Sequence, residues 1–188
     1  MNLPNKLTLL RIALVPVFAA FAALAIPTQN RLFYFLAGTV FAVASITDLL
    51  DGKIARERGL VTNFGKFADP LADKILTTAA FLYMQKEGVS APMVLILILF
   101  REFAVSGLRM LSAGQPGGKV IPANIWGKLK TVTMMGSILF FYFGSALFPN
   151  WSLVRPLTTA LCWICAAVTL MSGLTYFWES RDLFSDLN

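Results

Sequence analysis

The sequence predicts an all-α integral membrane protein with six transmembrane helices. Of its 188 residues, 57% are hydrophobic and 14% are charged, whereas soluble domains carry about a quarter charged residues. Six apolar segments each approach the roughly 20 residues that cross a bilayer. The connections between them are short and leave no room for a soluble domain. We therefore expect residues 1–188 to form a single transmembrane domain.

The apolar runs define the six helices in chain order. They extend over about Leu7 to Ile26, Leu32 to Arg56, Phe67 to Met84, Ala91 to Leu111, Ile125 to Phe148 and Leu153 to Phe177. Turn-forming residues separate them, at Pro27 to Asn30, Arg58–Gly59, Glu87–Gly88, Gly114 to Gly118 and Pro149–Asn150. The second segment becomes polar from Asp48 onward. The first has an alternative interpretation, because Lys6 and Arg11 before an apolar stretch also resemble a secretory signal peptide.

The positive charges predict the orientation in the membrane. Six spans place both termini on one side. Thirteen of the 16 Lys and Arg residues then fall on that side, namely Lys6, Arg11, Lys53, Arg56, Arg58, Lys66, Lys74, Arg101, Arg109, Lys119, Lys128, Lys130 and Arg181. The other three are Arg31, Lys86 and Arg155. Because cytoplasmic loops are enriched in Lys and Arg, we expect both termini and any active site to face the cytoplasm of a cell membrane.

The residue types that are rare exclude several kinds of chemistry. The chain has no histidine, which removes His general bases and His-rich metal sites. Its two cysteines, Cys162 and Cys165, provide no disulfide framework and are expected to be packing residues. The net charge of +6 suits anionic lipid headgroups rather than nucleic acid. Trp151, Tyr176 and Trp178 are expected to be anchors at the membrane interface.

Four aspartates form two helical pairs near the cytoplasmic ends of the second and third segments. Asp48 and Asp51 are three residues apart, and Asp69 and Asp73 are four apart, so each pair shares one helix face. A short connection makes the two helices antiparallel neighbours. We therefore expect the four carboxylates to converge.

Such a carboxylate cluster indicates a bound hard cation. Ionisable groups at membrane depth are costly and mark functional sites, and oxygen ligands without His or Cys favour Mg²⁺ or Mn²⁺. The alternative is that the aspartates form ion pairs with the neighbouring cations Lys53, Arg56, Lys66 and Lys74.

The residues around the aspartates form a known pattern. They read Asp48-x2-Asp51-Gly52-x2-Ala55-Arg56-x8-Gly65-x3-Asp69-x3-Asp73. This pattern resembles the complete signature of the CDP-alcohol phosphatidyltransferases, in residue types and in spacing. The resemblance extends to six spans and to the hydropathy of nearly the whole chain, and it implies the CDP-alcohol phosphotransferase fold and a homodimer.

The resemblance also implies roles for the residues of the signature. Asp48, Asp51 and Asp69 are then ligands of Mg²⁺ or Mn²⁺, expected as two ions, and Asp73 is the general base, with metal binding as its alternative role. CDP-diacylglycerol is expected to contact Gly52, Ala55, Arg56, Gly65, Asn5 and Thr8.

Further segments resemble one branch of the family, the bacterial phosphatidylglycerophosphate synthases. They are Pro4-Asn5-x2-Thr8-x2-Arg11, Asn63 to Lys74, Arg101-Glu102-Phe103-x-Val105-Ser106-Gly107-Leu108-Arg109 and Gly127-Lys128-x-Lys130-Thr131. This branch implies that CDP-diacylglycerol and sn-glycerol 3-phosphate give phosphatidylglycerol phosphate and CMP.

The dianionic acceptor calls for a basic pocket, for which the candidates are Arg101, Arg109, Lys128 and Lys130. A buried ion pair with Glu102 is the alternative role of Arg101, and topological anchoring is that of the two lysines.

Two other functions stay open at this point. A member of the same family with another acceptor, such as inositol phosphate, serine or phosphatidylglycerol, would keep the signature. A divalent-cation transporter lined by carboxylates would instead place its acidic residues at the bilayer midplane.

Overall fold

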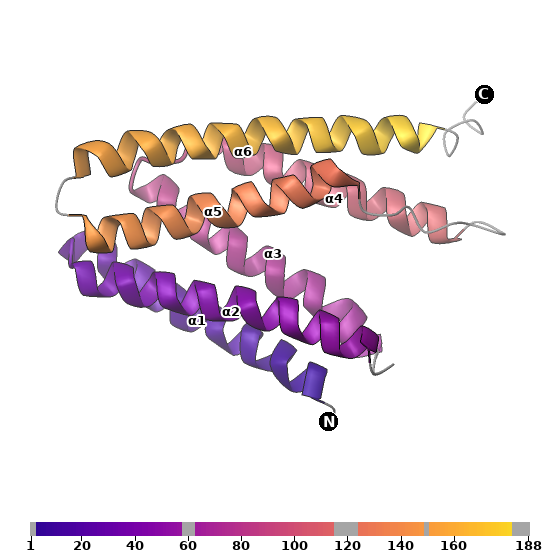
Figure 1. The fold of residues 1–188 in the computed structure, drawn as a ribbon, viewed down its shortest axis with the longest axis horizontal. Coiled ribbons are helices and arrows are strands. Elements are labelled where there is room, and N and C mark those ends of the chain that lie inside the picture. Colours follow the sequence, from indigo (N-terminus) through magenta and orange to yellow (C-terminus); the bar gives the residue numbers. More distant parts are fainter. Residues whose placement is uncertain (1–2, 58–62, 115–123, 149–150, 182–188) are drawn as a thin grey trace. The chain divides into compact units, whose positions relative to one another are not determined.

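A computed structural model describes residues 3–57, 63–114, 124–148 and 151–181. These residues form six helices (Figure 1). They are α1 (Leu3–Thr28), α2 (Arg31–Glu57), α3 (Asn63–Lys86), α4 (Pro92–Gly114), α5 (Ile125–Leu147) and α6 (Trp151–Glu179). The prediction of six helices is confirmed, and most of the predicted ends lie within a few residues of those observed.

Local residue chemistry accounts for several helix ends. The side-chain oxygen of Asn30 accepts a hydrogen bond from the Leu32 N–H at 2.9 Å, and Asn124 accepts one from the Gly127 N–H at the same distance. Both asparagines therefore cap the helix that follows, α2 and α5 respectively. After α3, Gly88 has a φ of 74°, a backbone conformation that favours glycine. Pro92, which has no N–H to leave unpaired, opens α4.

The chain forms two compact units. The first unit comprises Met1–Val89 and Ile138–Pro156, and the second comprises Ser90–Ser137 and Leu157–Asn188. α1, α2 and α3 belong to the first unit and α4 to the second, while α5 and α6 contribute residues to both.

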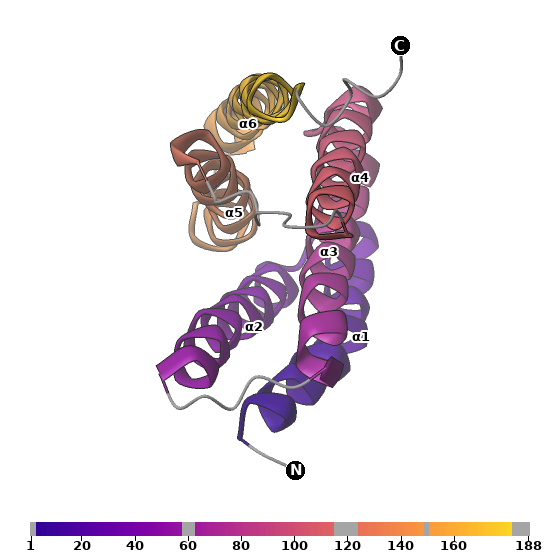
Figure 2. The same cartoon turned by 90° about the vertical axis from the view of Figure 1, so that its right-hand side faces the viewer.

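In the first unit, α1 packs against α2 and α3 (Figures 1 and 2). The centre of this packing is an aromatic cluster around Phe18 of α1. Its ring centroid lies 5.9 Å from that of Phe41, 6.5 Å from that of Tyr83 and 5.3 Å from that of Tyr142. Tilted and edge-on ring pairs of this kind are favourable beyond their buried area, so the cluster fixes the middle of α1 against its neighbours.

The first unit also contains a polar cluster, which surrounds the buried carboxylate of Glu87. Tyr34 donates a hydrogen bond to it at 2.7 Å, and Gln29 donates one at 3.1 Å. Arg155 forms an ion pair with it at 2.8 Å. These contacts join the connection after α1 to α2, to the end of α3 and to the first turns of α6.

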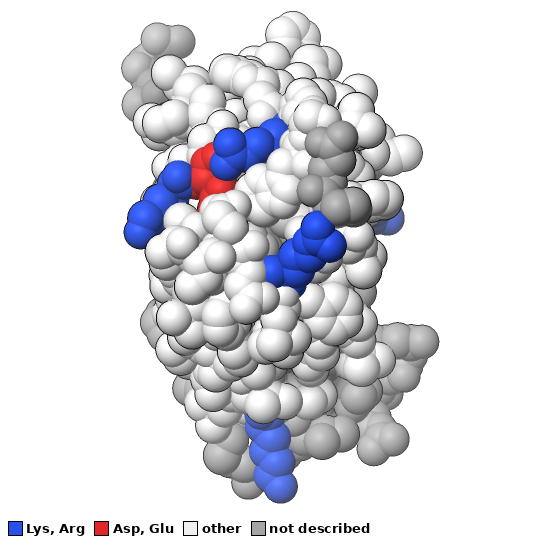
Figure 3. All heavy atoms as spheres, turned by 90° about the vertical axis from the view of Figure 1, so that its left-hand side faces the viewer, with Lys and Arg blue, Asp and Glu red and all other residues white. Residues whose placement is uncertain are grey.

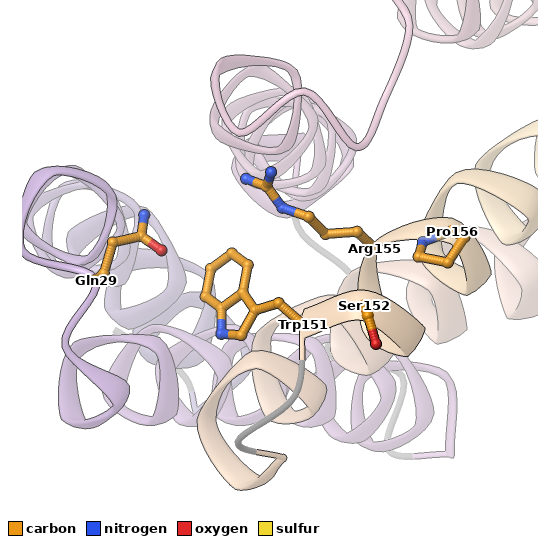
Figure 4. A pocket seen from close by; sticks show the side chains of 5 residues that line it. All are labelled: Gln29, Trp151, Ser152, Arg155 and Pro156. Carbon is orange, nitrogen blue, oxygen red and sulfur yellow. The ribbon is translucent and has the colours of Figure 1, made fainter.

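A hollow of about 450 Å³ lies beside this cluster, lined by Gln29, Trp151, Ser152, Arg155 and Pro156 (Figure 4). In it the Arg155 guanidinium lies 5.1 Å from the centroid of the Trp151 ring. Gln29 lies 18 positions after Arg11, at the end of α1, which corresponds to roughly 27 Å of helix. The hollow is therefore not part of the signature region.

In the second unit, the core joins residues of α4, α5 and α6. Val105 and Leu108 of α4, Met134 of α5, and Cys162 and Cys165 of α6 are all buried. Both cysteines are free thiols, in agreement with their predicted role in packing.

The outer surface suits a lipid environment. Large apolar side chains are exposed along the helices, among them Leu32, Phe100 and Leu174. On the face in Figure 3, most of the visible surface belongs to uncharged residues. By length and composition, three of the described helical segments can cross a membrane, Asn5–Thr28, Arg31–Asp48 and Trp151–Glu179. Of the other three helices, α3 and α4 carry charged residues along their apolar stretches, and α5 carries Lys128 and Lys130 in its first two turns.

Candidate active site

The signature residues lie on two neighbours of α1. Asp48 belongs to α2, while Gly65, Asp69 and Asp73 belong to α3. The three aspartates are half-buried. The side chains of Asp51, Gly52, Ala55 and Arg56 lie outside the described residues.

Arg11 of α1 brings two of the predicted carboxylates together. Its Nη1 atom lies 2.5 Å from Oδ1 of Asp48 and 4.0 Å from Oδ1 of Asp69. The arginine itself is 1% exposed, whereas the side chains of Asp48 and Asp69 are 31% and 37% exposed. One buried cation therefore holds carboxylates from α2 and α3 close to a single point, and both carboxylates remain accessible.

Thr8 lies one turn before Arg11 and contacts the same carboxylate of α3. Its hydroxyl donates a hydrogen bond of 2.6 Å to Oδ1 of Asp69. Residues three apart share a helix face, so the first turns of α1 present Thr8 and Arg11 together to the aspartates. Asn5, a further turn toward the amino terminus, is half-buried. Thr8 is predicted from the sequence to bind substrate, and in the structure it has a partner within the signature.

The two described carboxylates suit a hard cation. Both offer oxygen ligands, and both point toward the same Arg11 nitrogen from different helices. Among the residues whose side chains the structure describes, no three acidic, Cys or His side chains are grouped to hold a metal ion. Asp51, the predicted third ligand, is outside that set. Carboxylate oxygens are donors of the kind that Mg²⁺ and Mn²⁺ prefer.

In the second unit, two of the predicted acceptor residues form a buried ionic network with Glu102. The Arg101 Nη1 lies 3.1 Å from Oε1 of Glu102, and the Lys130 Nζ lies 2.6 Å from the same oxygen. Arg101 also donates a hydrogen bond of 2.5 Å to the hydroxyl of Ser172. The ion pair between Arg101 and Glu102, the alternative foreseen from sequence, is therefore present.

Arg109 and Lys128 differ in their surroundings. Arg109 is half-buried and donates a hydrogen bond of 2.7 Å to the hydroxyl of Tyr176. Lys128 is exposed on the first turn of α5. In the second unit, the cations Arg101, Arg109 and Lys130 therefore lie near the carboxylate of Glu102 or the ring of Tyr176. Lys128 is not part of this network.

Tyr176 corrects a prediction. The sequence predicts that Tyr176, like Trp151 and Trp178, is an interface anchor, but its side chain is 0% exposed and contacts both Arg101 and Arg109. Trp178, two residues later, is 74% exposed, which agrees with anchoring. Residues two apart on a helix point in nearly opposite directions. The sequence alone does not distinguish an aromatic residue on the buried face of a helix end from one on its exposed face.

Comparison with known proteins identifies the family of the chain. Residues 1–171 match the CDP-alcohol phosphatidyltransferase family. A CDP-diacylglycerol–glycerol-3-phosphate 3-phosphatidyltransferase of Bacillus subtilis (strain 168) is 39% identical over 95% of this chain and 96% of its own. An enzyme of the same name from Rickettsia bellii (strain RML369-C) is 36% identical over 97% of both chains.

A probable phosphatidylglycerophosphate synthase of Mycobacterium tuberculosis (strain CDC 1551 / Oshkosh) is 39% identical over 93% of this chain and 78% of its own. These matches cover nearly the whole chain, including the signature aspartates and the cations of the second unit. The chain belongs to the CDP-alcohol phosphatidyltransferase family, whose members are integral membrane proteins with several membrane passes.

Proposed function

We propose that this protein transfers the phosphatidyl group of CDP-diacylglycerol to sn-glycerol 3-phosphate, giving phosphatidylglycerol phosphate and CMP. The observation that carries the proposal is the complete signature, with Asp48 and Asp69 converging on Arg11. Relatives that bear the name of this activity support the choice of acceptor.

Asp48, Asp51 and Asp69 are proposed to hold Mg²⁺ or Mn²⁺, as two ions. When bound, such ions neutralise the pyrophosphate of CDP-diacylglycerol and stabilise the departing CMP. Arg11 and Thr8 set the positions of Asp48 and Asp69 from α1. The carboxylate geometry is thereby fixed before substrate binds.

Asp73 is proposed as the general base. It lies one turn beyond Asp69 on α3 and is half-buried. Its carboxylate accepts the proton of the acceptor's hydroxyl while that oxygen bonds to the phosphatidyl phosphorus. The bond between this phosphorus and the CMP oxygen breaks, and CMP leaves with the electron pair.

The remaining signature residues are proposed to bind CDP-diacylglycerol. Small residues at Gly52, Ala55 and Gly65 leave room for the nucleotide, and Arg56 supplies a cation for its phosphates. Asn5 and Thr8 approach the same site from α1.

The acceptor phosphate is proposed to bind the cations of the second unit, Arg101, Arg109, Lys128 and Lys130. Glu102 offsets one of these positive charges. The remaining excess of positive charge suits a dianion and not neutral glycerol.

The protein is further proposed to act as a homodimer with its site open to the bilayer and to the cytoplasm. The distribution of Lys and Arg between the two sides, 13 against three by the expected topology, supports this orientation.

A panel of acceptors tests the function directly. The purified protein, supplied with CDP-diacylglycerol and Mg²⁺ or Mn²⁺ in detergent micelles, is expected to release CMP with sn-glycerol 3-phosphate. Inositol phosphate, serine and phosphatidylglycerol should give little release. CMP release with another acceptor alone would reassign the substrate within the family. Cation uptake into liposomes without CMP release would favour a transporter.

Replacement of the acceptor cations should affect one substrate selectively. We expect Arg109→Ala and Lys128→Ala to raise the apparent KM for glycerol 3-phosphate by ~10–100-fold, the effect of losing a charge-assisted hydrogen bond. The KM for CDP-diacylglycerol should stay nearly unchanged, and initial rates with each substrate varied in turn measure both values.

Two further variants serve as comparisons for these kinetics. Arg56→Ala should show the opposite pattern, because it acts on the nucleotide substrate. Lys86→Ala removes an exposed cation of the first unit and should leave both KM values as they are. Parental kinetics for glycerol 3-phosphate in both the Arg109 and Lys128 variants would show that these residues are topological anchors.

A further inference from the structure

We propose that Tyr176 is a positioning residue for the acceptor site and holds the guanidinium groups of Arg101 and Arg109 in the arrangement that binds the acceptor phosphate. This inference rests on the proposed function, since it takes glycerol 3-phosphate as the acceptor. Nothing in the signature or in the branch segments includes this tyrosine.

Tyr176 contacts both arginines through two parts of its side chain. Its hydroxyl accepts the hydrogen bond from Arg109 at 2.7 Å. The guanidinium carbons of Arg101 and Arg109 lie 5.2 Å and 5.3 Å from the centroid of its ring. Guanidinium groups at such distances are attracted to an aromatic face.

The ring offsets a repulsion that would otherwise separate the two arginines. Arg101 and Arg109 are two helical turns apart on α4, so their side chains leave the helix on the same side. Two cations directed toward one region repel each other. Glu102 already pairs with Arg101, and a neutral, fully buried ring that attracts both arginines stabilises them further without adding a second negative charge.

Ser172 and Asn124 further restrict the positions of Arg101 and Tyr176. Ser172 lies one turn before Tyr176 on α6 and accepts the hydrogen bond from Arg101. The backbone N–H of Asn124 donates to the Tyr176 hydroxyl at 3.3 Å. The two arginines and Tyr176 are therefore held by α6, through Ser172, and by Asn124, which caps α5.

A glycine allows α5 to approach this cluster. A Cβ atom on Gly127 would lie 3.3 Å from Nη2 of Arg101 and 3.5 Å from the Tyr176 hydroxyl. The first of these is tighter than most such contacts, so a side chain here would shift the guanidinium of Arg101 by a few tenths of an ångström. Gly127 belongs to the segment that resembles the synthase branch, and this packing supplies a physical reason for a glycine there.

The arginines retain donors for a ligand. In the part of the chain that the structure describes, the Nε atoms of Arg101 and Arg109 are buried and have no hydrogen-bond partner. Buried donors without a partner are uncommon in folded proteins. A phosphate bound beside Tyr176 accepts hydrogen bonds from guanidinium groups in the geometry that arginine provides.

The test compares two tyrosines that are equally buried. Tyr176→Phe keeps the ring and removes the hydroxyl. Tyr142→Phe makes the same change in the aromatic cluster of the first unit, where the hydroxyl has no hydrogen-bond partner among the described residues. With both substrates varied in micelles, we expect Tyr176→Phe to raise the KM for glycerol 3-phosphate about 10-fold, the effect of one hydrogen bond to a charged group.

The kcat and the KM for CDP-diacylglycerol should change less than about twofold in Tyr176→Phe, and Tyr142→Phe should match the parent in all three constants. Tyr176→Leu, which also removes the ring, should raise the KM for glycerol 3-phosphate further. Inorganic phosphate, used as a competitive inhibitor against glycerol 3-phosphate, should bind more weakly to both Tyr176 variants. This inhibition constant reports the anion site without the chemical step.

The outcomes separate this inference from the proposed function. An unchanged KM for glycerol 3-phosphate in Tyr176→Phe overturns the positioning role, while the parent still forms phosphatidylglycerol phosphate. Equal losses with both substrates overturn it also, because they indicate a general packing role. If the parent itself does not use glycerol 3-phosphate, the proposed function fails first. If Tyr176→Leu does not fold, the Tyr176→Phe kinetics alone decide.

Discussion

Asp69→Asn is expected to abolish turnover while leaving the protein folded. The amide keeps the shape of the side chain and an oxygen that accepts the Thr8 hydrogen bond of 2.6 Å. It removes the negative charge that a divalent cation requires. Loss of several kcal/mol of transition-state stabilisation corresponds to a rate lower by on the order of 10³-fold or more. CMP release under saturating substrates measures the effect.

Asp48→Asn should abolish turnover too, but with a cost in stability. Asp48 is the ion-pair partner of Arg11, which is 1% exposed. Leaving a buried cation without its anion destabilises proteins by about 3–5 kcal/mol when the pair is fully buried. The cost here should be smaller, since Asp48 is 31% exposed and asparagine still accepts a hydrogen bond. The melting temperature should therefore fall more in Asp48→Asn than in Asp69→Asn.

Three controls decide what the loss of activity means. Glu179→Gln makes the same chemical change at an exposed position of α6 and should keep parental activity. Excess EDTA should abolish the parental activity, and Mg²⁺ or Mn²⁺ should restore it. Binding of Mn²⁺, followed by electron paramagnetic resonance, should weaken in both aspartate variants. Normal activity in either variant, or full activity in EDTA, would contradict the assignment of these residues to a metal.

The helices were predictable because their signal is local. An apolar run after Pro27 and Asn30 predicts a second helix that starts near Leu32, with a polar continuation from Asp48 to Arg56, and α2 occupies Arg31–Glu57. The amino terminus was less well placed, since Pro4 and Asn5 interrupt the apolar pattern, yet α1 begins at Leu3. A proline in the first turn is compatible with a helix, and polar residues there do not prevent one.

The meeting of Asp48 with Asp69 was also predictable, because helical spacing and a short connection determine it. Arg11, the residue that holds the two aspartates together, was less predictable. Arg11 lies 37 residues from Asp48, and the sequence places it only in the segment Pro4-Asn5-x2-Thr8-x2-Arg11, which the family resemblance expects to close the site from the first span. That it is buried and touches both carboxylates depends on the packing of α1 against α2 and α3.

The ionic network around Glu102 was predictable from the sequence only in part. The neighbouring residues Arg101 and Glu102 suggest an ion pair by themselves, and that pair is present. The contacts of this network with Lys130, Ser172 and Tyr176 join residues 28 to 75 positions apart. No periodicity encodes such contacts, so a role for Tyr176 emerged only from the three-dimensional arrangement.

Asp73→Asn is expected to slow the chemical step by ~10²–10⁴-fold, the usual cost of losing a general base. Binding of Mn²⁺ and of CDP-diacylglycerol should be retained. The helix should tolerate the change, because asparagine has nearly the same size and shape as aspartate, and the backbone carbonyl of residue 73 still accepts the hydrogen bond from Thr77 at 2.9 Å. Single-turnover formation of CMP with both substrates bound measures the step itself.

The comparison with Asp69→Asn distinguishes a base from a ligand. Both aspartates lie on α3, one turn apart, so a general disturbance of this helix would affect the two variants alike. A base variant loses turnover while its affinity for Mn²⁺ and for the nucleotide substrate stays within about twofold of the parent. A ligand variant loses metal affinity together with turnover. If Asp73→Asn behaves as Asp69→Asn does, Asp73 belongs to the metal ligands and the proton must leave the acceptor by another group.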